Sequence, residues 1–371
     1  MSLRVSVRIA LLVMVAAIAI FTVACGDDDD DGNASNQDTA AEEPAAEEPA
    51  AEEEAGASEP VMAEDLEYTV TEASEAHQIA VVLGSRTGPW PEAEMRGAEK
   101  AAEELGVEVD ISAPAEWDAT QQADVVSTAL NKQPAFMVVQ PADAETMIPP
   151  LDAANQQGIS MVTIDTFIGD GVYGTDEPGA FPLTFVGSNN YDGGVMGCEA
   201  LAEKIGNKGK VYIQDNTPGA SSTADRTKGC MSVLEQHPDI QVVGKQFGEE
   251  DPAKAQAQTE TIMQKHPDLA GIFANAGFVS EGAANAVRTQ GKENDVAVVM
   301  FDATPANIDL LKNKTAFGVV AQRPALMGEV GVRLAVEYLE GNEDLPAMVD
   351  TGMQVVTQDT IDEVDLAEIT Y

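Results

Sequence analysis

From Gln78 onward, short runs of apolar and mostly β-branched residues alternate with longer segments whose apolar residues recur every three or four positions. The short runs predict strands, and the longer segments predict amphipathic helices. The strand runs are almost continuously apolar, which is typical of parallel strands covered by helices on both faces. In the first half of the chain we expect strands at 79–83, 107–111, 135–140 and 159–165, and helices at 91–106, 120–132 and 144–157.

The same alternation starts again after a loop that follows residue 165. Here we expect strands at 184–189, 210–215, 241–247, 269–275 and 295–302, and helices at 191–205, 221–236, 252–265 and 280–290. Two such series predict an α/β fold made of two doubly wound, parallel-sheet lobes. The length agrees, because the region from residue 61 to 371, about 310 residues, is larger than one hydrophobic core usually is.

The N-terminus has the pattern of an export signal. Arg4 and Arg8 form a short cationic region, and the apolar run that follows, 9–24, is short for a membrane span. The run ends at Cys25, which Gly26 follows, as in a bacterial lipobox, where the cysteine is lipidated and begins the mature chain. We therefore expect a signal peptide at 1–24 and lipidation of Cys25. A plain cleaved signal or a short anchor helix is the alternative.

Residues 25–60 form an acidic, low-complexity segment. It opens with five aspartates, 27–31, and continues as AAEEPAAEEPAAEEEA without Lys or Arg. Such a segment buries too little apolar surface to offset its ordering entropy, so we expect a disordered linker on a lipid anchor. The folded, solute-binding domain would then be 61–371.

The charge balance limits the possible partners. The chain has 20 Lys and Arg against 64 Asp and Glu, for a formal net charge of −44. The region after residue 60 stays strongly acidic, which argues against nucleic acid or an anionic membrane surface as a direct partner.

Cysteine usage leaves one question open. Besides Cys25, the chain has only Cys198 and Cys230. Both fall on expected helices of a chain that we expect to leave the cytosol, where disulfides persist. A bridge and two buried thiols are equally good interpretations. No CxxC or Cys/His cluster supports a metal site, and nothing indicates a cofactor.

Several strings, taken together in their order and spacing, resemble a known family. They are TIDT (163–166), FVGSNNYDGG (185–194), GASSTADRTKG (219–229), VMFDATP (299–305) and VVAQRPALMG (319–328). The chain from 78 to about 362 is similar to the ribose-type sugar-binding proteins of ABC importers, which have the type I periplasmic binding protein fold.

The resemblance implies a hinge of three chain crossings between the lobes. One lobe would hold about 76–187 and 323–350, and the other about 188–322 and 351–371. It also implies a monomer that captures a monosaccharide and delivers it to a permease and its ATPase, touching the membrane only through the lipid anchor.

Two aspartates are the first candidates for ligand contact. Asp165 and Asp302 each end an expected strand, and ligands of open α/β sheets bind beyond the carboxyl ends of strands. Both match family positions that accept hydrogen bonds from sugar hydroxyls; a helix cap or loop carboxylate is the alternative for each. Trp90 and Trp117 follow the first two strands and could stack on a sugar ring, although Trp117 fits surface packing equally well.

The resemblance adds four more candidates. Gln322 and Asn275 match or lie near family positions that contact ligand, and Ser222 could supply a hydroxyl. Arg226 is either a sugar-binding arginine or a structural one. Thr166 stands where the family often has an arginine, which suggests a ligand different from ribose.

Two other classes of function, a signalling receptor and an enzyme, are alternatives. The same fold can present a sugar or a furanone-like signal to a chemoreceptor or sensor kinase. An enzyme is disfavoured, because the chain lacks a GxSxG elbow and its three histidines, His77, His237 and His266, lie in expected turns or before the first strand.

Overall fold

The computed structural model describes residues 60–364 and 366–371, which belong to one compact unit. The predicted signal peptide, Cys25 and nearly all of the predicted linker lie outside the described residues. None of the described helices is long and apolar enough to cross a membrane.

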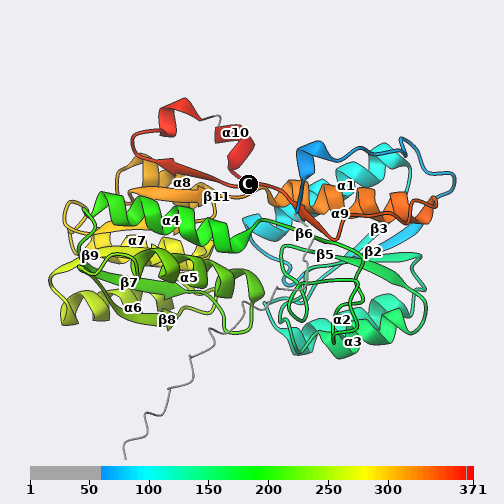
Figure 1. Ribbon diagram of the computed structural model, residues 1–371, viewed down its shortest axis with the longest axis horizontal. Helices are drawn as coiled ribbons and strands as arrows, with labels where there is room; N and C mark the ends of the chain where they lie inside the picture. Colours follow the sequence, from blue (N-terminus) through cyan, green and yellow to red (C-terminus); the bar gives the residue numbers. More distant parts are fainter. Residues whose placement is uncertain (1–59, 365) are drawn as a thin grey trace, which may run out of the picture. The chain divides into compact units, whose positions relative to one another are not determined.

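The first lobe is a seven-stranded, wholly parallel sheet (Figure 1). Its strands, in spatial order, are β1 (Val61–Met62), β12 (Met348–Asp350), β6 (Phe185–Gly187), β5 (Ser160–Ile164), β4 (Phe136–Val139), β2 (Gln78–Val82) and β3 (Glu108–Ser112). Side chains of β4 alternate between two cores: Phe136 and Val138 enter one, and Met137 and Val139 enter the other. Both faces are therefore buried, which explains the continuous apolar runs.

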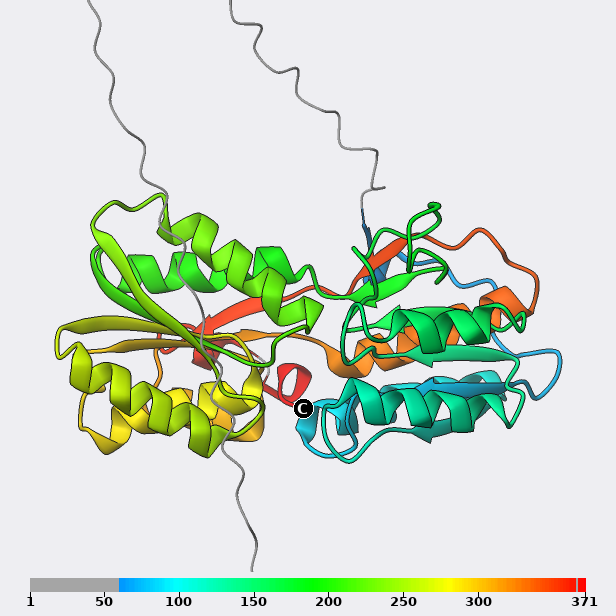
Figure 2. The same cartoon turned by 90° about the horizontal axis from the view of Figure 1, so that it is seen from below.

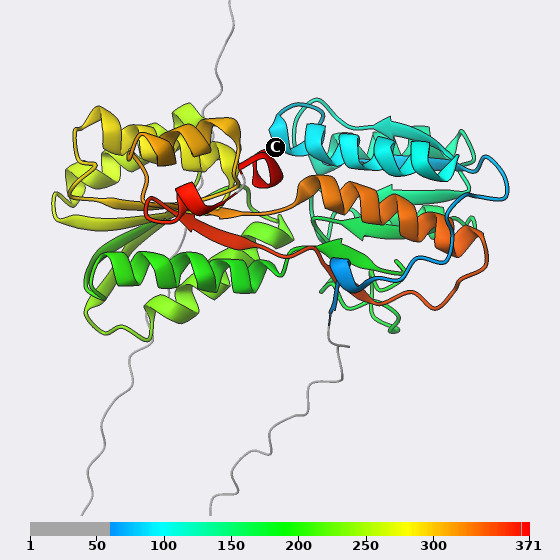
Figure 3. The same ribbon diagram turned by 90° about the horizontal axis from the view of Figure 1, so that it is seen from above.

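Four helices cover this sheet. They are α1 (Pro89–Leu105) and α9 (Pro324–Leu339) on one face, and α2 (Ala119–Leu130) and α3 (Ile148–Asn155) on the other. Figure 3 shows α1 and α9 side by side, although they are far apart in the sequence. Gly97 of α1 permits this approach, because a Cβ there would lie 1.8 Å from the carbonyl oxygen of Ala325.

The second lobe is a six-stranded sheet. Its spatial order is β13 (Gln354–Thr357), β11 (Gly318–Ala321), β10 (Ala297–Phe301), β9 (Leu269–Ala274), β7 (Gly209–Asp215) and β8 (Ile240–Phe247). All neighbouring strands are parallel except β13, which runs antiparallel to β11. This edge strand departs from the wholly parallel expectation, because the chain reaches it directly from β12 of the first sheet, which ends at Asp350, and not through a crossover helix of its own sheet.

Five helices cover the second sheet. They are α4 (Asn190–Lys204) and α5 (Ser221–Leu234) on one face, and α6 (Pro252–Lys265), α7 (Gly277–Thr289) and α8 (Pro305–Lys312) on the other. The short elements η1 (Ala63–Asp65), η2 (Ile361–Glu363) and α10 (Leu366–Ile369) complete the described chain. The prediction of an α/β fold with two doubly wound lobes is confirmed.

The chain passes between the two sheets three times (Figure 2). It leaves the first sheet after Gly187, returns after Ala321 and leaves again after Asp350. Each lobe is therefore assembled from separated segments of sequence, and neither corresponds to one continuous stretch of the chain.

A disulfide joins Cys198 of α4 to Cys230 of α5, both fully buried. The structure thus selects the bridge over two free thiols. Glycines bring the same helices together, because a Cβ on Gly194 would lie 2.0 Å from the carbonyl oxygen of Arg226. Gly194, the second glycine of the string YDGG, therefore serves close helix packing.

Candidate functional site

A cavity of about 340 Å³ opens among loops that follow the strands of both lobes. The first lobe contributes Ser85, Thr87, Pro89, Trp90, Pro91, Trp117 and Asp165. The second lobe contributes Asn216, Ala220, Ser222, Thr223, Arg226, Glu250, Ala276, Gly277, Phe278, Glu281, Asp302, Thr304, Pro305 and Ala306. Among the described residues, no group of three or more His, Cys, Asp or Glu side chains is placed to hold a metal ion.

Asp165 and Asp302 occupy equivalent positions in the two lobes. Asp165 follows β5 and Asp302 follows β10, and each has a left-handed backbone, with φ of 61° and 70°. Asp is one of the few side chains that visit this region readily. Both carboxylates are almost fully buried, at 5% and 6% exposure, yet both line the cavity.

Asp165 is held by one side-chain amide. Gln140, directly after β4, donates through Nε2 to Asp165 Oδ2 at 2.8 Å and to Glu94 Oε1 at 3.1 Å. Burial raises the pKa of Asp165 to about 6, although Arg226 and the bond from Gln140 lower it. Glu94 is fully buried, and burial together with Asp165 raises its pKa well above the ordinary range. Behind Asp165 there is thus a second carboxyl and no nearby lysine.

Asp302 is held from two sides. Gln322, directly after β11, donates through Nε2 to Oδ1 at 2.7 Å, and the backbone N–H of Gly277 donates to Oδ2 at 2.7 Å. Gly277 is the first residue of α7, so the carboxylate caps a helix N-terminus. Asn307 also donates to the carbonyl oxygen of Asp302 at 2.9 Å, which fixes the turn.

Arg226 lines the cavity but is fixed by the protein. Its Nε donates to Asn190 Oδ1 at 2.8 Å, and its Nη1 donates to the carbonyl oxygen of Asn275 at 2.9 Å. The guanidinium carbon lies 4.0 Å from the centroid of the Phe301 ring. The side chain thus has a structural role and also lines the cavity, where ligand contact by Arg226 stays a prediction.

Three aromatic side chains border the cavity: Trp90, Trp117 and Phe278. Trp117 is anchored by its indole N–H, which donates to the carbonyl oxygen of Ala142 at 2.8 Å, and its ring lies against Gly84. Trp90 packs edge-on against Tyr371, with ring centroids 5.4 Å apart. Flat apolar walls beside buried oxygen acceptors suit a ring-shaped solute that carries hydroxyls.

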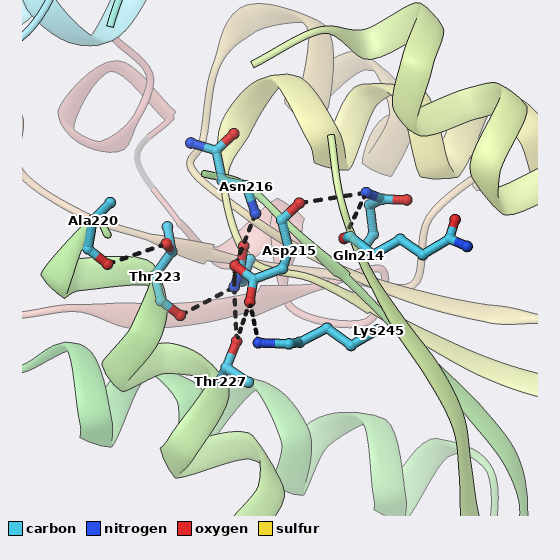
Figure 4. A network of polar contacts seen from close by, with 9 residues as sticks. Gln214, Asp215, Asn216, Ala220, Thr223, Thr227 and Lys245 are labelled. Atoms are coloured by element: carbon cyan, nitrogen blue, oxygen red, sulfur yellow. Dashed lines mark hydrogen bonds and ion pairs between the residues drawn. The ribbon is translucent and has the colours of Figure 1, made fainter. Parts of the chain in front are cut away.

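Asn275 and Gln322, two of the expected ligand residues, do not line the cavity. Asn275 is fully buried and donates to Asp215 Oδ1 at 2.7 Å and to the carbonyl oxygen of Thr223 at 3.2 Å. Figure 4 shows the surrounding network, in which Asp215 also meets Thr227 and Lys245. These residues shape the end of β7, and Gln322 acts on Asp302 instead.

Several residues of this region were not predicted from the sequence: Gln140, Glu94, Asn216, Glu250, Phe278, Glu281 and Tyr371. A sequence signal for Gln140 exists, because the string FMVVQ (136–140) resembles FGVVAQ (317–322), which ends at Gln322. Each glutamine directly follows a buried strand, and the neighbouring strand in the sheet is followed by an aspartate. Glu250 has no comparable signal, since its position depends on the loop conformation after β8.

The sequence and the fold were compared with those of known proteins. Residues 79–343 match the model of the family described as periplasmic binding protein domain. The ribose import binding protein RbsB of Bacillus subtilis is 29% identical over 71% of this chain and 82% of its own length. The D-allose-binding periplasmic protein of Escherichia coli is 28% identical over 74% of this chain and 89% of its own.

Solved structures agree with these relatives. An ABC transporter solute-binding protein from Agrobacterium vitis, bound with α-D-tagatopyranose, is 34% identical, with a TM-score of 0.77, over 80% of this chain and 99% of its own. One from Burkholderia graminis, in complex with D-arabinose, is 25% identical with a TM-score of 0.72, over 79% and 99%. The chain therefore belongs to the periplasmic binding protein domain family.

Proposed function

We propose that this protein is the extracytoplasmic solute-binding component of an ABC importer, and that it captures a monosaccharide in the cavity between its lobes. The observation that carries the proposal is the pair Asp165 and Asp302. Two buried acceptors from different lobes face one cavity bordered by aromatic rings. Relatives that match along nearly their whole length bind ribose, allose, tagatose or arabinose.

In this mechanism Asp165 and Asp302 accept hydrogen bonds from hydroxyls of one sugar. Carboxylates suit this role because each oxygen accepts without donating. Trp90 and Trp117 supply apolar faces for the ring, and Ser222 supplies a hydroxyl. Because one ligand contacts both lobes, its binding favours the arrangement in which the lobes enclose it, and that arrangement is delivered to the permease and its ATPase.

The rest of the chain fits delivery at a membrane. We propose that 1–24 is removed as a signal, that Cys25 is lipidated, and that the acidic segment up to residue 60 tethers the domain. The three histidines do not line the cavity: His77 pairs with Glu340 at 2.9 Å, and His237 and His266 lie where helices turn into strands. The cavity therefore presents acceptors and stacking surfaces without a histidine base.

A thermal-shift screen tests this proposal. The purified full chain is heated with D-ribose, D-allose, D-arabinose, D-tagatose, hexosamines, polyols and furanones. A ligand that binds only the native state stabilises it by about 2.7 kcal/mol at 100 times its Kd. We expect one monosaccharide to raise the Tm, and the rise to disappear in Asp165→Ala and Asp302→Ala.

Intrinsic fluorescence gives an independent readout, because the chain's two tryptophans, Trp90 and Trp117, both line the cavity. The same monosaccharide should change the emission with the same midpoint. If no monosaccharide moves either signal while a furanone does, the importer proposal gives way to a signalling receptor.

A further inference from the structure

The cavity is short of positive charge. Its lining residues include four carboxylates, Asp165, Glu250, Glu281 and Asp302, against one cation, Arg226. Two donor nitrogens of Arg226 are already bonded to Asn190 and to the carbonyl oxygen of Asn275. Two carboxylates are sufficient to orient a neutral sugar from both lobes, so Glu250 and Glu281 require a separate explanation.

Glu250 is placed on the cavity wall by an unusual turn. Glu249 and Glu250 both have left-handed backbones, with φ of 54° and 58°. Asn216, itself a lining residue, holds the turn: its carbonyl oxygen accepts from Glu249 N at 2.9 Å, and its Oδ1 accepts from Glu250 N at 3.1 Å. Consecutive non-glycine residues rarely adopt this conformation, and it persists where the surroundings enforce it.

The nearby lysines are engaged by other carboxylates. Lys254 pairs with Glu249 Oε2 at 2.5 Å, and Lys245 pairs with Asp215 Oδ2 at 3.1 Å. Within the described chain, neither Glu250 nor Glu281 forms an ion pair. Burial raises the pKa of Glu250 to about 7, and Asp165 and Asp302 add to that rise, while the bond from Asn216 opposes it. The remaining charged or titratable groups around the cavity are Glu281, Arg226 and, beside Asp302, Tyr371.

We propose, building on the function above, that the solute is an amino sugar whose protonated amine pairs with Glu250. The hydroxyls of such a ligand bind Asp165 and Asp302 as in the neutral case. Its ammonium group supplies the cation that the cavity wall lacks, with Glu281 adding to the negative field. A charge-assisted hydrogen bond is about twice as strong as a neutral one.

Calorimetric titration of the full chain tests this inference with matched ligands. D-glucosamine, D-galactosamine and D-mannosamine are compared with their parent hexoses and with the N-acetyl forms, which keep the substituent but lose the charge. We expect one amine to bind about 10- to 100-fold more tightly than its parent hexose and its N-acetyl form, since hydrogen bonds to charged groups contribute about 1.5–3 kcal/mol.

Two variants of the same turn locate the effect. Glu250→Gln should lower affinity for the amine by about 10- to 100-fold and leave the parent hexose within about threefold. Glu249→Gln is the control, because Glu249 shares the turn and the left-handed backbone but pairs with Lys254 and is not a lining residue. It should change neither affinity.

The outcomes separate this inference from the proposed function. Equal or tighter binding of a parent hexose, unaffected by Glu250→Gln, overturns the amine and leaves monosaccharide capture standing. Tighter binding of a neutral hexose at pH 6 than at pH 8, lost in Glu250→Gln, also overturns it, because Glu250 would then donate as an acid. Failure of every amine and every neutral monosaccharide to bind overturns both.

Discussion

The two strand-end aspartates are built alike. Asp165 follows β5 and Asp302 follows β10, and each has a left-handed backbone that turns its carboxylate toward the cavity. Each receives a hydrogen bond from a glutamine that follows the neighbouring parallel strand, Gln140 after β4 and Gln322 after β11. Both lobes thus have the same arrangement, in which a carboxylate is oriented by the side-chain amide of a glutamine that follows the neighbouring strand.

The surroundings of the two carboxylates differ. Asp302 accepts two hydrogen bonds, one from the side chain of Gln322 and one from the backbone N–H of Gly277 at the N-terminus of α7. Asp165 accepts one, from an amide that it shares with the fully buried Glu94. The comparison teaches that similar backbone geometry does not fix the hydrogen bonds that a side chain receives. The partners behind it do.

The largest expected difference is between substitutions of the two glutamines, measured as the loss of stability of the folded protein. The side chain of Gln140 bonds to Gly84 N, Glu94 and Asp165, whereas Gln322 bonds to Asp302 and its own Oε1 has no partner in the described structure. We expect Gln140→Leu to lower the free energy of unfolding by about 2–4 kcal/mol and Gln322→Leu by about 1 kcal/mol, measured by urea unfolding. Equal losses would show that the two supports are equivalent.

Asparagine substitutions should act in opposite directions at pH 7. Asn keeps a left-handed backbone and similar volume. Asp165→Asn removes a charge from beside Glu94 and should raise the free energy of unfolding by about 3 kcal/mol. Asp302→Asn weakens the bond to the start of α7 and should lower it by about 1–2 kcal/mol. Thermal unfolding of both variants decides, and a loss of stability in both would contradict the comparison.

The pH dependence should follow Asp165. Its pKa is about 6 in the folded protein against an ordinary 3.8. Between these values the folded state binds more protons than the unfolded state, so this group makes stability fall as pH rises from about 4 to about 6. The stabilisation of Asp165→Asn relative to the natural chain should therefore vanish near pH 4 and approach about 3 kcal/mol by pH 7. A difference that does not change with pH would locate the effect elsewhere.

The smallest expected effect concerns Tyr371, which lies near Trp90 of the first lobe and Asp302 of the second. Its ring packs on Trp90, while burial and the nearby Asp302 raise the pKa of its hydroxyl well above 10. The hydroxyl oxygen has no hydrogen bond of normal geometry to the described residues. Tyr371→Phe should therefore change the free energy of unfolding by less than about 0.5 kcal/mol in urea. A larger loss would mean that Asp302 depends on this hydroxyl.

The sequence predicted the fold because strand-period and helix-period patterns are local. It predicted the positions of Asp165 and Asp302 because strand ends follow from the same patterns, and their contact with ligand stays a prediction. It did not predict the role of Gln322, since whether a polar side chain meets ligand or a neighbouring carboxylate depends on distances across the sheet. Glu250 was missed for another reason. Two left-handed residues in succession leave no mark in hydrophobic periodicity, and only the contacts of Asn216 reveal them.

The redox state of Cys198 and Cys230 in the folded protein reports the conditions under which that molecule folded. Both cysteines are wholly inaccessible once α4 and α5 have packed. An oxidant must therefore reach them before the second lobe closes around them, and a chain that folds in a reducing compartment keeps two protected thiols. Thiols that react with a thiol reagent only after denaturation would therefore give the fraction of a purified sample that folded under reducing conditions.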